Sequence, residues 1–100
     1  MATVTVHQTE EFGDWLHRLK DERAKARIVA RIRRMELGNP GDTKHLGGGL
    51  REIRIDYGPG YRIYFVERDA SVVLLLCGGD KQTQQRDIVR ARKLIKELKG

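Results

Sequence analysis

Charged side chains alternate with apolar ones between residues 50 and 66, a spacing that could gather several of them on one surface. Successive side chains of a strand point to opposite faces. The isoleucine and phenylalanine side chains then share one face, and the other face carries Glu52, Arg54, Arg62 and Tyr64. A guanidinium group fits two phosphate oxygens and stays charged at every working pH. This face is therefore a candidate phosphate-binding surface with a carboxylate beside it.

Three strands joined by two turns are predicted to position these residues. The sequence Tyr-Gly-Pro-Gly at 57–60 predicts the first turn and Arg-Asp-Ala-Ser at 68–71 predicts the second. The third strand, 72–77, is apolar throughout, which is typical of a strand covered on both sides. It ends in Gly-Gly-Asp-Lys at 78–81, which brings Asp80 and Lys81 beside the same sheet.

Upstream of the sheet, the pattern predicts a short strand and two helices. Residues 3–7 alternate β-branched and small side chains, as in a strand. Thr9 and Asp21 are the expected N-caps of the helices, each followed by apolar residues at helical spacing. Gly-Asn-Pro-Gly at 38–41 ends the second helix.

Residues 41–49 are predicted to form a loop, with the triple glycine at 47–49 as a flexible connector. A phosphate-binding loop would need a Lys-Ser/Thr pair opening a helix after its glycines, whereas Leu50 opens a strand. A final helix is expected after Asp80 or Thr83, either of which could cap it. It packs on the sheet or is held more loosely, and its expected apolar stripe contains Ile88, Val89, Ala91, Leu94, Ile95 and Leu98.

The chain has 100 residues, which predicts one domain spanning 1–100. It contains no apolar run long enough for a membrane span and no visible secretory signal. Cys77 is the single cysteine and is expected to be a small buried hydrophobe, which suits a reducing cytoplasm. The three histidines have no paired spacing, so we expect neither a metal site nor a cofactor.

Basic residues exceed acidic ones by 20 to 14, a net charge of +6. Residues 18–34 alone contain eight basic and two acidic residues, so the excess is concentrated on the predicted helices. Such a face is either merely solvated or a surface for RNA phosphates or an acidic partner. The candidate RNA-binding residues are Arg23, Arg27, Arg31 and Arg34 on the helices, and Arg51 and Tyr64 on the sheet.

Two segments in register carry a resemblance to a known family. Residues 54–64 (RIDYGPGYRIY) and 74–81 (LLLCGGDK) closely resemble the phage-Gp49-like, HigB-type addiction module killer proteins of the RelE/ParE toxin superfamily. The resemblance extends over nearly the whole chain. It implies an α+β fold of order β-α-α-β-β-β-α, in which an N-terminal strand and a helical hairpin pack on an antiparallel sheet that a C-terminal helix follows.

The same resemblance implies the toxin of a type II toxin–antitoxin system. Its expected partner is a cognate antitoxin, commonly a small helix-turn-helix protein. RelE and HigB relatives cut mRNA in the ribosomal decoding site, whereas ParE relatives inhibit DNA gyrase by protein binding. The first activity, a ribosome-dependent endoribonuclease without metal, is our leading expectation. Fold cannot separate the two, but an mRNA cutter needs a cluster of cations that a gyrase binder does not.

The resemblance also suggests residue roles. Arg62 matches the RelE arginine that faces the scissile phosphate, Arg54 falls near a RelE lysine, and Lys81 falls near the basic residue on the leaving-group side. RNA cleavage through the 2′-hydroxyl further needs a general base. Arginine does not readily lose a proton, so Glu52 or Asp80 takes this role in our interpretation.

This chain departs from its relatives in two respects. It has no histidine after residue 45, where HigB toxins have histidines near the C-terminus, and no tyrosine in the last helix, where RelE has one. An alternative role for Arg54 is a salt bridge within the sheet, to Glu52, Asp56 or Glu67.

Overall fold

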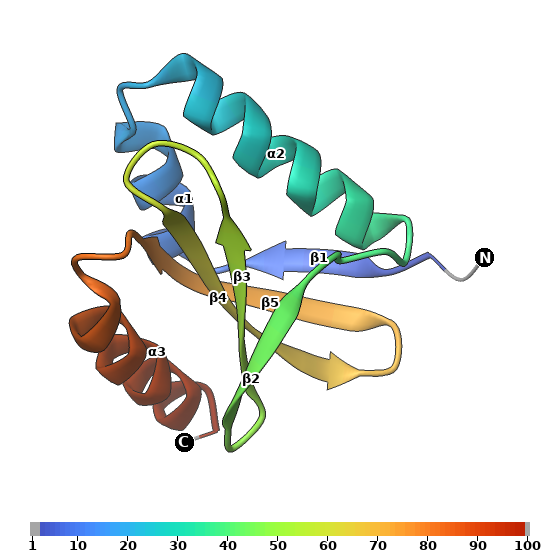
Figure 1. Ribbon diagram of the computed structural model, residues 1–100. Helices are drawn as coiled ribbons and strands as arrows, with labels where there is room; N and C mark the ends of the chain where they lie inside the picture. Colours follow the sequence, from blue (N-terminus) through green and yellow to red (C-terminus); the bar gives the residue numbers. More distant parts are fainter. Residues whose placement is uncertain (1–2, 100) are drawn as a thin grey trace.

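The computed structural model describes residues 3–99. Five strands form one sheet in the order β1-β5-β4-β3-β2, with β1 parallel to β5 and all other pairs antiparallel (Figure 1). The elements in chain order are β1 Thr5–Gln8, α1 Glu10–Arg18, α2 Glu22–Glu36, β2 Thr43–Gly47, β3 Leu50–Ile55, β4 Tyr61–Asp69, β5 Val72–Gly79 and α3 Gln84–Lys99. The predicted α+β class and helix order are confirmed, with one strand more than expected.

The additional strand is β2, which lies where the sequence predicts a loop. It pairs antiparallel with β3 at the edge of the sheet, where Lys44 stands opposite Glu52. The sequence of β2 lacks apolar alternation, so the usual period-two signal is missing. Arg31 of α2 braces the segment before it by donating hydrogen bonds to the carbonyl oxygens of Pro40 and Asp42 at 3.2 and 3.5 Å. The loop prediction is therefore wrong.

Helices α1 and α2 cover one face of the sheet. Their buried side chains Phe12, Ile28 and Met35 pack against a layer formed by Ile53, Ile55, Ile63, Phe65, Val73 and Leu75. Both predicted caps are present. The Thr9 hydroxyl accepts the backbone N–H of Phe12 at 3.0 Å, and the Asp21 carboxylate accepts those of Arg23 and Ala24.

Helix α3 covers part of the opposite face. Ala91 and Leu94 pack there against Leu50, Tyr64, Leu74, Leu76 and Cys77. Of the two placements that the sequence left open for the last helix, the structure shows the packed one, and the apolar third strand is covered on both sides as expected. Two members of the expected apolar stripe, Val89 and Leu98, are exposed instead. Within residues 3–99, no helix is long and apolar enough to cross a membrane.

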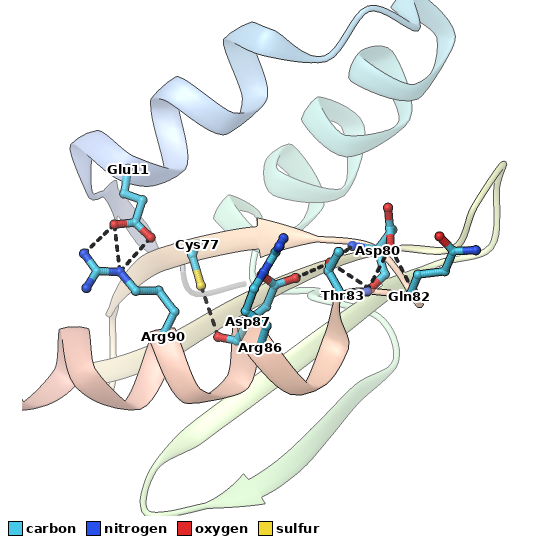
Figure 2. Close-up of polar contacts among 8 residues, drawn as sticks. All are labelled: Glu11, Cys77, Asp80, Gln82, Thr83, Arg86, Asp87 and Arg90. Carbon is cyan, nitrogen blue, oxygen red and sulfur yellow. Dashed lines mark hydrogen bonds and ion pairs between the residues drawn. The ribbon is translucent and has the colours of Figure 1, made fainter.

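An ion pair joins the helices of the two faces. Arg90 of α3 donates to the carboxylate of Glu11 of α1, from Nε to both oxygens at 3.0 Å and from Nη2 at 2.6 Å (Figure 2). The hydrogen bond from Arg90 lowers the pKa of Glu11, against the opposing effect of burial. The pair fixes the middle of α3 to the helical hairpin, across 79 residues of sequence.

The first turn of α3 is anchored separately, at the end of β5. Asp80 accepts the backbone N–H groups of Gln82 and Thr83 at 2.9 and 3.2 Å, and its own N–H donates to the Thr83 hydroxyl (Figure 2). That hydroxyl also donates to the buried Asp87 carboxylate at 2.5 Å. Asp80 and Thr83 thus cap the helix together, and its start is held by side chains on both sides of the turn.

Candidate functional site

A cleft of about 600 Å³ opens where β2, β3, β4 and the turn after β5 meet. Four cationic side chains line it, one from each of these elements: Lys44, Arg54, Arg62 and Lys81. Arg54 and Arg62 stand directly opposite each other in the β3–β4 register. The fold therefore brings together the three cations that the sequence singled out, and Lys44 joins them.

Glu52 lies beneath the cations and is fully buried. Its Oε1 accepts hydrogen bonds from Arg54 Nε at 2.8 Å and from Arg62 Nη1 at 3.4 Å, and its Oε2 accepts one from Gln84 Nε2 at 3.0 Å. Burial raises the pKa of Glu52, but the hydrogen bonds from Arg54 and Gln84 and the charge of Arg62 outweigh it, so the pKa is lowered overall. Glu52 is thus an ionised carboxylate with both oxygens engaged.

Arg62 is the deepest cation of the cleft, with only 7% of the residue exposed. Its contact with Glu52 is long for a hydrogen bond, and its Nε has no partner among residues 3–99. A buried cation with unfilled donors is unusual, because such groups normally find partners. Arg62 lines the cleft, although its unpaired Nε is itself buried and away from solvent.

Arg54 and Lys81 are the more accessible cations. The Arg54 side chain is 51% exposed, and Lys81 is exposed at the start of the turn that leads to α3. The Lys81 backbone N–H donates to the Pro59 carbonyl at 3.4 Å, which holds this turn against the β3–β4 turn. The sequence left open a salt bridge between Arg54 and Glu52, and this salt bridge is present. Arg54 also lines the wall of the cleft.

Two of the predicted residues have contacts that place them outside the cleft lining. Asp80, a candidate base, caps α3 and is not among the lining side chains. Tyr64 is fully buried beneath α3, and its hydroxyl has no hydrogen-bond partner within the described chain. Its burial leaves no surface for the predicted contact with an RNA base.

Arg51 and Arg31 serve internal contacts. Arg51 lies on the face opposite the cleft, where it pairs with Glu67, donates to the Thr43 hydroxyl at 2.9 Å and stacks over Phe65. Arg31 donates to the carbonyl oxygen of Arg54 at 3.0 Å, and burial lowers its pKa. Both guanidinium groups hold protein segments together, so the predicted RNA contacts would compete with these interactions.

The other predicted basic residues remain on the surface of α2. Arg23, Arg27 and Arg34 are exposed, and the Arg27 guanidinium lies 4.5 Å from the centre of the Tyr57 ring. They do not line the cleft. The helix thus presents a second, separate basic surface.

Sequence reasoning missed two residues of the site. Lys44 was hidden by the loop prediction, although recognition of β2 would have placed it opposite Glu52. Gln84 carries no sequence signal, because its contact with Glu52 spans 32 residues. Within residues 3–99, no group of three or more His, Cys, Asp or Glu side chains gathers in a way that could hold a metal ion.

Comparison with known proteins places the chain among relatives. Residues 14–97 match the family model described as phage-derived protein Gp49-like (DUF891). The chain is also 49% identical over 96 residues to a protein of Haemophilus influenzae described as uncharacterized, covering 96% of this chain and 97% of that protein. The family match spans β2, β3, β4, β5 and the turn after β5, and so the positions of all four cations of the cleft. The chain therefore belongs to the phage-derived Gp49-like family.

Proposed function

We propose that this protein is the toxin of a bacterial type II toxin–antitoxin system, of the RelE/ParE superfamily and HigB type, and that it cuts mRNA on the ribosome. The observation that carries the proposal is the cleft in which Arg54, Arg62 and Lys81 converge from three elements. Membership of the Gp49-like family and the resemblance of residues 54–64 and 74–81 to HigB-type toxins support it.

The proposed reaction uses the RNA's own 2′-hydroxyl as the nucleophile on the adjacent phosphate. Negative charge grows on the phosphate oxygens in the transition state, and fixed cations stabilise it most where water is excluded. Arg62, nearly buried, faces this charge, and Arg54 holds a second phosphate oxygen. Lys81 donates toward the leaving 5′-oxygen, and Lys44 at the edge strand contacts a neighbouring phosphate.

The carboxylates near the cleft have supporting roles in this proposal. Glu52 has a lowered pKa and is therefore a weaker proton acceptor than an ordinary carboxylate. Asp80 is engaged by two backbone N–H groups of the α3 cap. In this proposal the 2′-hydroxyl gives its proton to solvent water as it attacks, and the chain contributes mainly positive charge and orientation.

The proposed cellular partners are the ribosome with its mRNA and a cognate antitoxin in the cytoplasm. The exposed arginines of α2 form a surface for a partner with acidic side chains. We expect the antitoxin, a small helix-turn-helix protein, to bind there or across the cleft. The reading frame beside the gene should encode it.

The decisive experiment is induced expression in bacteria, followed by pulse labelling and primer extension on mRNA. Translation should fall before DNA synthesis, and new mRNA ends should appear within translated frames. Lys81→Ala should remove the new ends, whereas the matched control Lys93→Ala, an exposed lysine of α3 outside the cleft, should not. An early arrest of DNA synthesis with SOS induction would instead identify a gyrase inhibitor.

A further inference from the structure

We propose that Glu52 and Gln84 are positioning residues, which orient Arg54 and Arg62 and make the geometry of the cleft depend on the first turn of α3. The inference rests on the proposed function, because it takes the cleft as the reaction site. Glu52 and Gln84 keep the two cations in place, and a movement of the first turn of α3 would shift them.

The two arginines lie close enough to repel each other. Arg54 and Arg62 occupy directly opposite positions of β3 and β4, on the same face of the sheet. Like charges at such positions repel each other. A single oxygen of Glu52 contacts both guanidinium groups, so one carboxylate offsets the repulsion and fixes the separation of the two cations.

The other oxygen of the Glu52 carboxylate is held by a hydrogen bond from α3. Gln84 is the first residue of α3, and its Nε2 donates to Glu52 Oε2 at 3.0 Å. With Oε1 held by the arginines and Oε2 held by Gln84, the plane of the carboxylate is set from both ends. Removing the amide leaves the carboxylate free to rotate about its last side-chain bond, and both arginines follow.

The backbone that carries Gln84 is itself held in place. The turn before Gln84 is closed by Asp80 and Thr83, and the buried Asp87 receives the Thr83 hydroxyl one turn later (Figure 2). The Gln84 amide is therefore carried by an anchored backbone. A displacement of this first turn would remove the Gln84 hydrogen bond from Glu52.

The competing role for Glu52 is that of general base. A base acts on the substrate directly, so its loss should slow the reaction whether or not the arginines are present. A positioning residue acts through the arginines, and its loss should have no further effect once they are gone. Gln84 separates the two roles most cleanly, because an amide does not serve as the base.

The first test is single-turnover cleavage of mRNA on programmed ribosomes. Gln84→Ala should slow cleavage by roughly 10-fold to 100-fold, by analogy with the loss seen when the hydrogen-bond partner of a metal ligand is removed. The matched control is Gln85→Ala, the exposed next residue, which should cut at the wild-type rate. Circular dichroism should show both variants folded at the assay temperature, with a lower thermal midpoint for Gln84→Ala because one oxygen of the buried Glu52 loses its partner.

The second test places Gln84→Ala and Glu52→Asp in the background of a double Arg54→Ala, Arg62→Ala variant. Neither substitution should then reduce the residual rate further. An equal fold-loss with and without the arginines would overturn the positioning role, and for Glu52 it would indicate a direct catalytic one. Gln84→Ala keeps the inference testable if substitutions of the buried Glu52 prevent folding.

A third measurement is independent of cleavage. The Nε–H of Arg54 donates to Glu52 and should exchange slowly with solvent in ¹⁵N spectra of the wild type. Its exchange should accelerate in Gln84→Ala and stay unchanged in Gln85→Ala. Unchanged exchange in both would refute the coupling. If the wild type cut no mRNA, the proposed function would fall, whereas this measurement would still decide whether α3 positions the arginines.

Discussion

Gly79 at the end of β5 lies against the buried carboxylate of Asp87 on α3, and no space remains between them for a side chain. A Cβ built on Gly79 would overlap Asp87 Oδ2 and approach the Thr83 hydroxyl within 2.7 Å. Because residue 79 is glycine, the first turn of α3 can pack directly against β5. Figure 2 shows Thr83 and Asp87, the two side chains that approach the strand there. This packing fixes the position of Gln84, which in turn holds Glu52 in the cleft.

Gly79→Ala should therefore destabilise the protein by about 1–3 kcal/mol, the usual cost of forcing an extra carbon into a packed site. Urea unfolding followed by circular dichroism measures this. Gly13→Ala is the matched control, because Gly13 lies in α1 and a Cβ there meets only the flexible end of Gln8. Alanine favours helix over glycine, so the control should be neutral or stabilising. A similar loss in both variants would argue against the tight docking.

Asp87 should make stability fall as the pH rises. Burial raises its pKa from the ordinary 3.8, while the Thr83 hydroxyl and Arg86 act in the opposite direction. The folded protein therefore binds this proton more tightly than the unfolded chain does. Its contribution to stability is complete below the ordinary pKa and is lost as the pH rises through the raised value.

The measurement is the free energy of unfolding of wild type and Asp87→Asn between about pH 3 and pH 7. The asparagine does not titrate, so the free energy of unfolding of the variant should increase relative to that of wild type as the pH rises. Glu52 and Glu11 have lowered pKa values and act in the opposite sense, but they are common to both proteins. A difference that does not vary with pH would contradict the raised pKa of Asp87.

Arg62→Ala should reduce mRNA cleavage by about 10²–10³-fold, as loss of one preorganised donor to a developing charge typically does. It should also destabilise the protein, because the buried Glu52 loses one of its two arginine partners and keeps only Arg54 and the amide of Gln84. Adding Glu52→Gln should recover part of the stability and none of the activity. Arg62→Lys should restore only part of the cleavage rate, since an ammonium group lacks the planar fork of a guanidinium group. A folded Arg62→Ala protein with wild-type cleavage would make this arginine purely structural.

Lys44→Ala should weaken RNA binding without changing the thermal midpoint, because Lys44 is exposed on the edge strand and lines the cleft. If it contacts one phosphate, the slope of log affinity against log salt should become shallower by about 1. Fluorescence anisotropy with a short RNA measures this slope. Lys93→Ala, outside the cleft, should leave it unchanged, and an unchanged slope for Lys44→Ala would place its side chain away from the RNA.

Cys77 should be inert to thiol reagents in the folded protein at pH 8. Burial raises the pKa of its thiol to about 12, and the sulfur lies 3.6 Å from the carbonyl oxygen of Asp87, to which it donates. Only the thiolate reacts, so modification should await unfolding. Mass spectrometry after iodoacetamide treatment, with and without guanidinium chloride, checks this. Rapid labelling of the folded protein would mean that α3 leaves the sheet readily.

Local patterns in the sequence were sufficient to predict most elements and the core face of the sheet. The caps at Thr9 and Asp21 and the turn at 57–60 depend on residues within one turn of each other, so they can be recognised without the fold. Strand alternation likewise placed Ile53 and Ile63 in the core. It also placed Arg54 and Arg62 on a common face, which is why the centre of the candidate site was predictable.

The environment of that face was decided only by tertiary structure. An amphipathic pattern shows that α3 has an apolar side, but not which surface it covers, because many surfaces can bury the same stripe. It docks on the arginine side, where it buries Tyr64 and brings Gln84 onto the buried carboxylate of Glu52 across 32 residues. Strand β2 was likewise not predictable from the sequence, because it forms by pairing with β3 rather than through a pattern of its own side chains. Burial and hydrogen bonds between distant residues are set by packing, and they determine which of the charged groups are supports and which can meet a substrate.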